Sequence, residues 1–448
     1  MKRIRTWAAI TLMIAGTITG CGTSDDLEGS NIGPENEQPE PTPERPTYIE
    51  LTRSETELVN GSNDFAFNLF RELTKNDGTT IEEGNTESDS QDFSNNPSLI
   101  ISPISITYAL GMLNNGAAGE TLSQINEVLG FGTAGADGIN DFCRKMLTTA
   151  PALDPLTKVI IANTIFMNKG YELKSDFTKK AKEFYDAEPE TRDFHDGQTM
   201  NVINQWASDH TEKMIEKVLN EDTFTPDAVS YLLNAIYFKG PWRKVYEFDK
   251  NETKNETFTT NGVETQVPMM HHAEEKYQYT ENDLCQALSI PYGSGAYKMT
   301  ILLPRENKSV QDVLQTLTAD SWKQQYTWMD DAYADVKLPR FETDTDIKLN
   351  DIMSVLGMPD AFDKEKAKFP EFCNRETYIG LMKQVAKIKV SEEGTEASAV
   401  TVIGMDMAAL PIEKEPKHVT FHATRPFLYV ISERTTGAIF FIGKYTGK

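Results

Sequence analysis

The amino-acid sequence predicts an α+β fold with large, mostly antiparallel sheets. Helical and strand-like patterns are mixed along the chain without regular alternation of strand and helix, which is not the pattern of a parallel α/β sheet. Two apolar runs at the C-terminal end, 427–431 and 438–442, flank a short polar turn and predict a hairpin. The chain has 448 residues, 39% hydrophobic and 25% charged, so it can form one large core or two medium ones.

The predicted elements follow from local patterns. Phe65, Leu69, Phe70 and Leu73 share one face of a helix, and a strand at 99–101 leads into a helix that ends near Asn115. Further helices are expected at 121–129, 173–185, 202–219 and 346–356, and further strands at 159–166, 231–238, 299–303 and 381–390.

The charge balance limits the choice of partners. The chain has 44 Lys and Arg against 68 Asp and Glu, giving a net charge of −24. Such a chain repels a phosphate backbone and an anionic membrane surface. We therefore expect no nucleic-acid partner.

The N-terminus has the features of an export signal. A basic start is followed by the apolar run 7–18, which is too short to span a membrane as a stable helix, and by small residues before Cys21. This pattern resembles a bacterial lipoprotein signal over residues 1–20, with Cys21 as the lipidated residue; an ordinary cleaved secretory signal is the alternative. The acidic residues at 24–28 resemble signals that carry some lipoproteins to the outer cell surface.

The segment 21–52 is expected to be a tether. From residue 22 it carries eight acidic residues, one arginine and five prolines, too little apolar surface to fold. A second polar, acidic stretch at 76–96 predicts a surface insertion. The folded domain is therefore expected over residues 53–448.

The sequence carries no catalytic or cofactor-binding motif in a context that predicts an enzyme. The sequence at 130–135 fits GxGxxG, but it follows a helical pattern rather than a strand. His271 and His272 lie beside acidic residues, yet we interpret them as a solvated turn and predict no metal site. No cofactor is expected. With Cys21 lipidated, at least one of the other three cysteines, Cys143, Cys285 and Cys373, stays unpaired.

The most unusual segment is 392–410. It has few large side chains, as an exposed loop would, but its small or β-branched residues alternate from Thr395 through Ala397 and Ala399 to Thr401. It contains no proline, which would block insertion into a sheet. A segment that suits both a loop and a central strand predicts a fold with two states; a flexible surface loop with a chance pattern is the alternative.

Several motifs along residues 55–446 resemble the serpin family. The segment 392–397 is similar to the hinge of inhibitory serpins, 101–106 to the shutter segment, and 234–242 to the central-sheet strand and breach. Three more segments, 267–270, 338–341 and 421–427, also resemble serpin signatures.

The resemblance implies a fold of three mostly antiparallel sheets, eight or nine helices and an exposed reactive loop. It also implies a mechanism: a protease attacks one bond of the loop, forms an acyl-enzyme, and is displaced when the loop inserts into the central sheet. Such an inhibitor is not itself an enzyme, and we expect it to act as a monomer on its target protease.

The resemblance assigns roles to individual residues. The hinge comprises Glu392, Gly394, Thr395, Glu396, Ala397, Ser398 and Ala399, and the shutter and breach comprise Ser102, Ser105, Asn234, Trp242 and Gln384. Serpins commonly have a histidine where this chain has Gln384, so a pH-sensing role is not carried over.

The reactive bond is placed by the family's usual distance from the hinge. Counting from Glu392 gives Ala408–Ala409, and one residue less gives Met407–Ala408. No Lys or Arg occurs between Lys389 and Lys414, which disfavours trypsin-like targets. Elastase-like or subtilisin-like serine proteases are expected, with papain-like cysteine proteases as an alternative.

Other functions remain open at this point. A non-inhibitory serpin would act as a surface binding or structural protein, although Ala397, Ser398 and Ala399 do not suit one. A hydrolase or a ligand-binding lipoprotein would need a convergent polar pocket. The expected location is the cell envelope, as an outer-membrane lipoprotein that faces the exterior.

Overall fold

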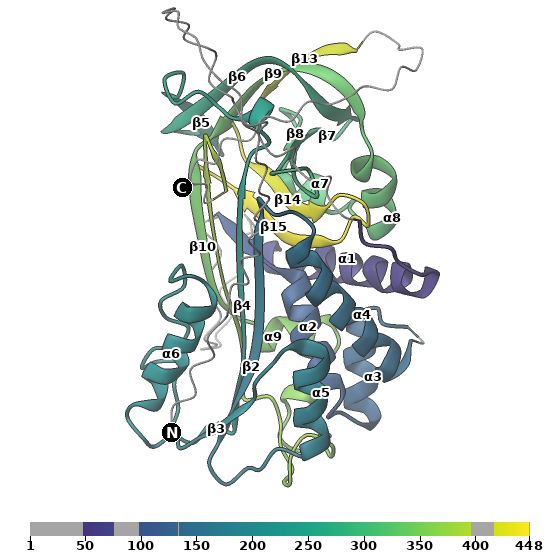
Figure 1. Cartoon of the computed structure of the whole chain (residues 1–448). Coiled ribbons are helices and arrows are strands. Elements are labelled where there is room, and N and C mark those ends of the chain that lie inside the picture. Colours follow the sequence, from purple (N-terminus) through teal and green to yellow (C-terminus); the bar gives the residue numbers. More distant parts are fainter. Residues whose placement is uncertain (1–47, 76–97, 133, 396–415, 448) are drawn as a thin grey trace, which may run out of the picture. The chain divides into compact units, whose positions relative to one another are not determined.

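The structure is a computed structural model that describes residues 48–75, 98–132, 134–395 and 416–447 (Figure 1). Helices and strands are interspersed along the chain. The α-helices of this part are α1 (Arg53–Thr74), α2 (Pro103–Asn114), α3 (Gly119–Val128), α4 (Gly135–Thr149), α5 (Ser175–Tyr185), α6 (Thr199–His210), α7 (Val310–Leu314), α8 (Ala319–Trp322) and α9 (Asn350–Leu356).

The strands form two hydrogen-bonded sheets. The six-stranded sheet has the order β10-β11-β12-β4-β2-β3, with β10 (Phe341–Lys348), β11 (Leu381–Ser391), β12 (Gly394–Thr395), β4 (Ser230–Pro241), β2 (Lys158–Asn168) and β3 (Glu190–Arg192). The nine-stranded sheet contains β1 (Leu99–Ile101), β5 (Lys254–Thr260), β6 (Val263–Glu281), β7 (Cys285–Pro291), β8 (Tyr297–Pro304), β9 (Asp330–Pro339), β13 (Lys417–His422), β14 (Phe427–Glu433) and β15 (Ile439–Tyr445).

The nine-stranded sheet is continuous because β6 is shared between its two halves. The first residues of β6 pair with β5, and its last residues pair with β7. A register shift between His272 and Glu275 lies between these two regions. The three sheets that were expected are thus connected as two in the described residues, and the α+β class is confirmed.

The six-stranded sheet is covered on both faces. Figure 1 shows α6 on one side of β2 and β4, and α2 and α5 on the other side. Alternate residues of β4 point to opposite faces: Leu232 and Ile236 belong to the large core, whereas Tyr231 and Leu233 belong to a smaller cluster with α6. A strand in the middle of this sheet is therefore buried on both sides.

Two helix predictions differ from the structure. The helix expected over 202–219 ends at His210, because Glu212 and Lys213 adopt positive φ angles that break it. The helix expected from Asp346 begins at Asn350, since Asp346 lies in β10, where buried and exposed residues alternate as in a half-buried strand.

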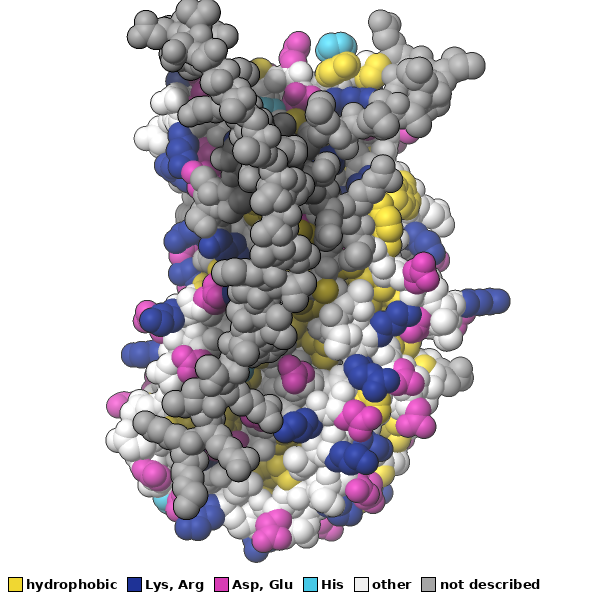
Figure 2. Space-filling view, viewed as in Figure 1, with side chains coloured by type: hydrophobic (Ala, Val, Ile, Leu, Met, Phe, Trp, Pro, Cys, Tyr) yellow, Lys and Arg dark blue, Asp and Glu magenta, His cyan; other side chains and the backbone are white. Residues whose placement is uncertain are grey.

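The described surface carries charges of both signs. Figure 2 shows Lys and Arg side chains interspersed with Asp and Glu on one face of the molecule. Among the described helices, none is long and apolar enough to cross a membrane.

Candidate functional site

The candidate site is the seam between β4 and β11 in the six-stranded sheet. Over residues 381–385, β11 pairs directly with β4, in parallel, opposite residues 231–235. Further along, the strands are separated by β12, which is antiparallel to both: Thr395 pairs with Gly240 on β4 and with Val390 on β11. We call the part with β12 the upper seam and the directly paired part the lower seam.

Close backbone packing fixes the start of β12. Gly394 has φ 138°, and a Cβ at this position would lie 2.3 Å from the carbonyl oxygen of Gly240. The backbone N–H of Trp242 donates to the Glu393 carbonyl at 2.9 Å, and that of Phe248 donates to the Glu392 carbonyl at 3.0 Å. A side chain at residue 394 would therefore force β12 away from β4.

Thr395 is buried beneath the upper seam. Its side chain is 1% exposed, and its hydroxyl lies 2.7 Å from the hydroxyl of Tyr292. Burial raises the pKa of Tyr292, which keeps this hydroxyl protonated. Tyr292 stacks on Trp242 with ring centroids 4.6 Å apart, and the Trp242 indole N–H donates to the Ser391 carbonyl at 2.9 Å.

Ion pairs surround the residues before β12. The Glu392 side chain is 2% exposed; it accepts a hydrogen bond from the Thr253 hydroxyl at 2.7 Å and pairs with Arg340 at 3.3 Å. Glu393 pairs with Lys250. A buried carboxylate is tolerated only when it is paired in this way.

A neutral polar cluster lies under the lower seam. Gln384 Nε2 donates to the Ser102 carbonyl at 2.9 Å and to Asn234 Oδ1 at 3.3 Å, and its Oε1 accepts from the Ser102 N–H at 2.9 Å. Ser105 bonds to Asn234 and to Gln384. The structure therefore brings the four residues from α2, β4 and β11 together, and the Gln384–Asn234 bond crosses the seam.

Asn163 is a member of this cluster that sequence reasoning missed. Its Oδ1 accepts from Asn234 Nδ2 at 2.7 Å, and its side chain is buried on β2. The signal was present, because Asn163 and Thr164 interrupt an otherwise apolar strand-like run.

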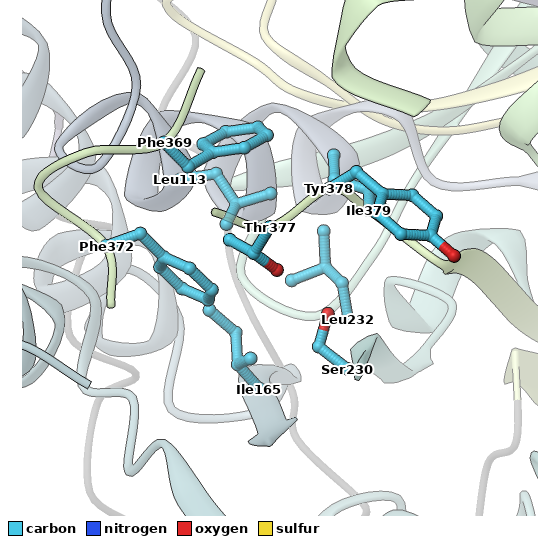
Figure 3. A pocket seen from close by; sticks show the side chains of 9 residues that line it. All are labelled: Leu113, Ile165, Ser230, Leu232, Phe369, Phe372, Thr377, Tyr378 and Ile379. Atoms are coloured by element: carbon cyan, nitrogen blue, oxygen red, sulfur yellow. The ribbon is translucent and has the colours of Figure 1, made fainter. Parts of the chain in front are cut away.

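A small, mostly apolar cavity of about 10 Å³ lies at the end of the lower seam (Figure 3). Its lining comes from α2, β2, β4 and the segment before β11, and consists of Leu113, Ile165, Ser230, Leu232, Phe369, Phe372, Thr377, Tyr378 and Ile379. Thr377 is 6% exposed, and its hydroxyl has no hydrogen-bond partner in the described structure.

The interpretation of His271 and His272 as part of a solvated turn is wrong. Both lie in β6, where cross-strand partners are available. His271 Nε2 lies 2.6 Å from Asp335 Oδ1, and His272 Nδ1 lies 2.6 Å from the Tyr277 hydroxyl. Within the described residues, no group of three or more His, Cys, Asp or Glu side chains is arranged to bind a metal.

The cysteines of the described part, Cys143, Cys285 and Cys373, are all buried and free. Burial raises the pKa of the Cys143 thiol to about 12. Cys21, Glu396, Ala397, Ser398, Ala399, Met407, Ala408 and Ala409 lie outside the described residues.

Comparisons with known proteins place this chain in a family. Residues 60–447 match the model of the family described as Serpin (serine protease inhibitor). An uncharacterized serpin-like protein of Thermococcus kodakarensis is 32% identical over 87% of this chain and 85% of its own length, and human Serpin B8 is 30% identical over 87% and 99%.

Solved structures agree with this match. The thermophilic serpin tengpin in its native state has a TM-score of 0.74 at 27% identity, covering 89% of this chain and 96% of its own. Native protease nexin-1 with heparin has a TM-score of 0.72 at 26% identity, covering 88% and 99%. The chain belongs to the serpin family.

Proposed function

We propose that this protein is a suicide inhibitor of proteases whose reactive loop inserts between β4 and β11. Serpins are generally protease inhibitors rather than catalysts, and they generally form covalent complexes with their targets. The observation that carries the proposal is β12, since the first two residues of an added strand already lie in the upper seam.

The register of β12 defines where the following residues would go. Six residues beyond Thr395, the same register pairs Thr401 with Asn234 on β4 and with Gln384 on β11. A hydroxyl would thus arrive between the two amides that the inserted strand separates. This match of a small polar residue to a polar site supports insertion along the whole seam.

The face of each inserted side chain follows from the same register. Thr395 faces the buried Tyr292, so Ala397, Ala399 and Thr401 would share this inner face. These residues are small enough to pass over α2 and the neutral cluster. Glu396, Ser398 and Val400 would face the side of α6.

The chemistry requires a bond at the end of the inserting segment. The protease nucleophile attacks the carbonyl carbon of Ala408, the peptide bond to Ala409 breaks, and the amine of Ala409 leaves with a proton. The acyl group now joins the protease to Ala408, so insertion carries the protease along the sheet. About fifteen residues at roughly 3.3 Å each displace it by on the order of 50 Å.

Target choice follows from the loop composition. Because no Lys or Arg lies between Lys389 and Lys414, this segment offers no basic side chain to a protease whose specificity pocket is acidic. We propose elastase-like or subtilisin-like targets, with papain-like proteases as the alternative.

We also propose that the inhibitor acts as a monomer at the outer surface of its cell. This part of the proposal is supported by the signal-like residues 1–20, by Cys21 as a lipid attachment site and by the acidic tether that follows. Lipid labelling and cell fractionation test it: an unlipidated protein recovered only from the cytoplasm would exclude this location.

The decisive experiment mixes the chain from Gly22 onward, which keeps the α1 cap Thr52, with elastase, subtilisin, trypsin and papain. A complex that survives denaturation, together with a released peptide that starts at Ala409, is the expected result with elastase or subtilisin. Ala408→Arg should transfer complex formation to trypsin, and Met407→Arg should do so only if the alternative bond is used. Clean cleavage without any complex would indicate a non-inhibitory serpin.

A further inference from the structure

A second connection across the lower seam lies on the face opposite to the neutral cluster. After α6 the chain turns back, and residues 211–220 pack beneath it. We call α6 and this segment together the cap. Asn204 of α6 fixes the segment, because its Oδ1 accepts from the backbone N–H groups of Val218 and Leu219 at 2.9 Å each.

The cap straddles the seam. Val218 and Leu219 belong to an apolar cluster with Tyr231 and Leu233 of β4, and Leu381 and Val385 of β11 pack against the same cluster. These apolar contacts are not directional, so they allow the strands to slide and separate gradually.

Lys383 makes the directional contact between the cap and β11. It is 4% exposed and lies directly opposite Leu233 of β4. Its Nζ donates to the Val218 carbonyl at 2.6 Å and pairs with Asp346 of β10 at 2.8 Å. The side chain lies between Leu381 and Val385 on a face that is otherwise apolar at this level.

The two contacts of Lys383 respond differently when the seam opens. An added strand moves β11 about 4.8 Å away from β4. Because β10 is paired with β11 along eight residues, Asp346 moves with Lys383. The Val218 carbonyl is fixed to α6 through its neighbours, so the 2.6 Å bond to it must break unless the whole cap shifts.

We propose that Lys383 is a positioning residue that sets the rate of loop insertion by holding β11 to the cap. The inference rests on the proposed function and adds a second barrier to it, on the outer face of the seam. Breaking the bond leaves a buried carbonyl without a donor and a buried ammonium with one partner fewer, both of which are costly. The wild-type seam therefore opens more slowly than a seam without this bond, whether the cleaved loop or an added peptide enters it.

The test compares Lys383→Met with Lys389→Met. Methionine matches the length of lysine without its donor or charge. Lys389 lies on the same strand and the same face, but it is 55% exposed, pairs with Glu342 and lies beside β12, where the strands are already apart. Lys383→Arg keeps a cationic donor and should restore the wild-type rate.

Uptake of a synthetic peptide with the sequence of residues 395–408 gives a rate that needs no protease. Lys383→Met should take up the peptide about tenfold faster than wild type, the effect expected for loss of one charged hydrogen bond. Lys389→Met and Lys383→Arg should remain near the wild-type rate. Should Lys383→Met fold poorly, Lys383→Gln, which keeps a neutral donor, should give an intermediate acceleration.

Equal rates for the variants at residues 383 and 389 would overturn the inference. If wild type takes up peptide and traps protease but Lys383→Met is no faster, only the role of Lys383 fails. If wild type does neither, the proposed function itself fails.

Discussion

The upper and lower seam join the same two strands by different chemistry. In the upper seam β12 already lies between the strands, and the surrounding contacts are ion pairs and an aromatic stack: Glu392 with Arg340, Glu393 with Lys250, and Trp242 on Tyr292. In the lower seam the strands touch, and the contact on the inner face is the neutral bond between Gln384 and Asn234.

This difference indicates where the barrier to insertion lies. The upper seam needs no opening, because its strands are already separated and β12 has satisfied their hydrogen bonds. The lower seam must lose its five paired positions and the Gln384–Asn234 bond before a strand can enter. The upper seam thus fixes the register of the loop, and the lower seam determines when the loop moves.

The largest effect is expected from a charge in the upper seam. Thr395→Arg would bury a guanidinium beside Tyr292, in place of a neutral side chain that is bonded to the Tyr292 hydroxyl. The cost of burying an unpaired charge is many times the energy of the hydrogen bond it replaces. We expect loss of covalent complex formation with continued cleavage of the loop, measured on denaturing gels.

Thr420→Arg is the control for that experiment, since residue 420 lies on the exposed face of β13. It adds the same charge outside the seam and should leave complex formation intact. Normal trapping by Thr395→Arg would contradict a role for β12 as the start of the inserted strand.

The next largest effect is expected from the neutral cluster of the lower seam. Asn234→Leu removes partners from Gln384, Ser105 and Asn163 at once and leaves them buried. The expected loss is about 3 kcal/mol in the free energy of unfolding of the uncleaved protein, measured by denaturant titration. Asn255→Leu, at an exposed position of β5, is the matched control, and equal losses would contradict the importance of the cluster.

The resemblance to serpins, rather than any local pattern, made much of this site predictable. Ser102, Ser105, Asn234 and Gln384 were expected together because their segments resemble the shutter and breach of that family, and the structure gives the physical reason, since buried polar side chains need partners. The hairpin of β14 and β15 was predictable from the local pattern itself, because its strands are apolar and its turn is polar.

Other features depend on tertiary contacts that no local pattern encodes. In the sequence, nothing around Lys383 distinguishes it from the half-buried Lys387 and the exposed Lys389, because its burial results from the cap that folds over it. The early end of α6 depends on positive φ angles at Glu212 and Lys213, two residues that ordinarily favour helix. The partner of His271 is Asp335 on the neighbouring strand β9. The partner of His272 is Tyr277, which lies on β6 itself, beyond the register shift.

The smallest and sharpest prediction compares one substitution in the two halves of the seam. Thr377 and Thr395 are both buried, but the Thr395 hydroxyl has Tyr292 as its partner, whereas the Thr377 hydroxyl faces an apolar cavity without one. Valine has nearly the same shape as threonine and no hydroxyl. Thr395→Val should therefore destabilise the uncleaved protein by about 1 kcal/mol, because Tyr292 loses its partner, and Thr377→Val should stabilise it by a similar amount.

Thermal unfolding of the two variants and of wild type measures whether the two substitutions change stability in opposite directions. If Thr377→Val is more stable than wild type, the unsatisfied Thr377 hydroxyl weakens the uncleaved state. This hydroxyl would then lie at the end of the lower seam, on the path that the inserted strand must take. Destabilisation by both variants would mean instead that the Thr377 hydroxyl is bonded in solution, for instance by a water in the cavity. The Thr377 hydroxyl would then not weaken the lower seam, and the barrier to insertion would rest on the neutral cluster and Lys383.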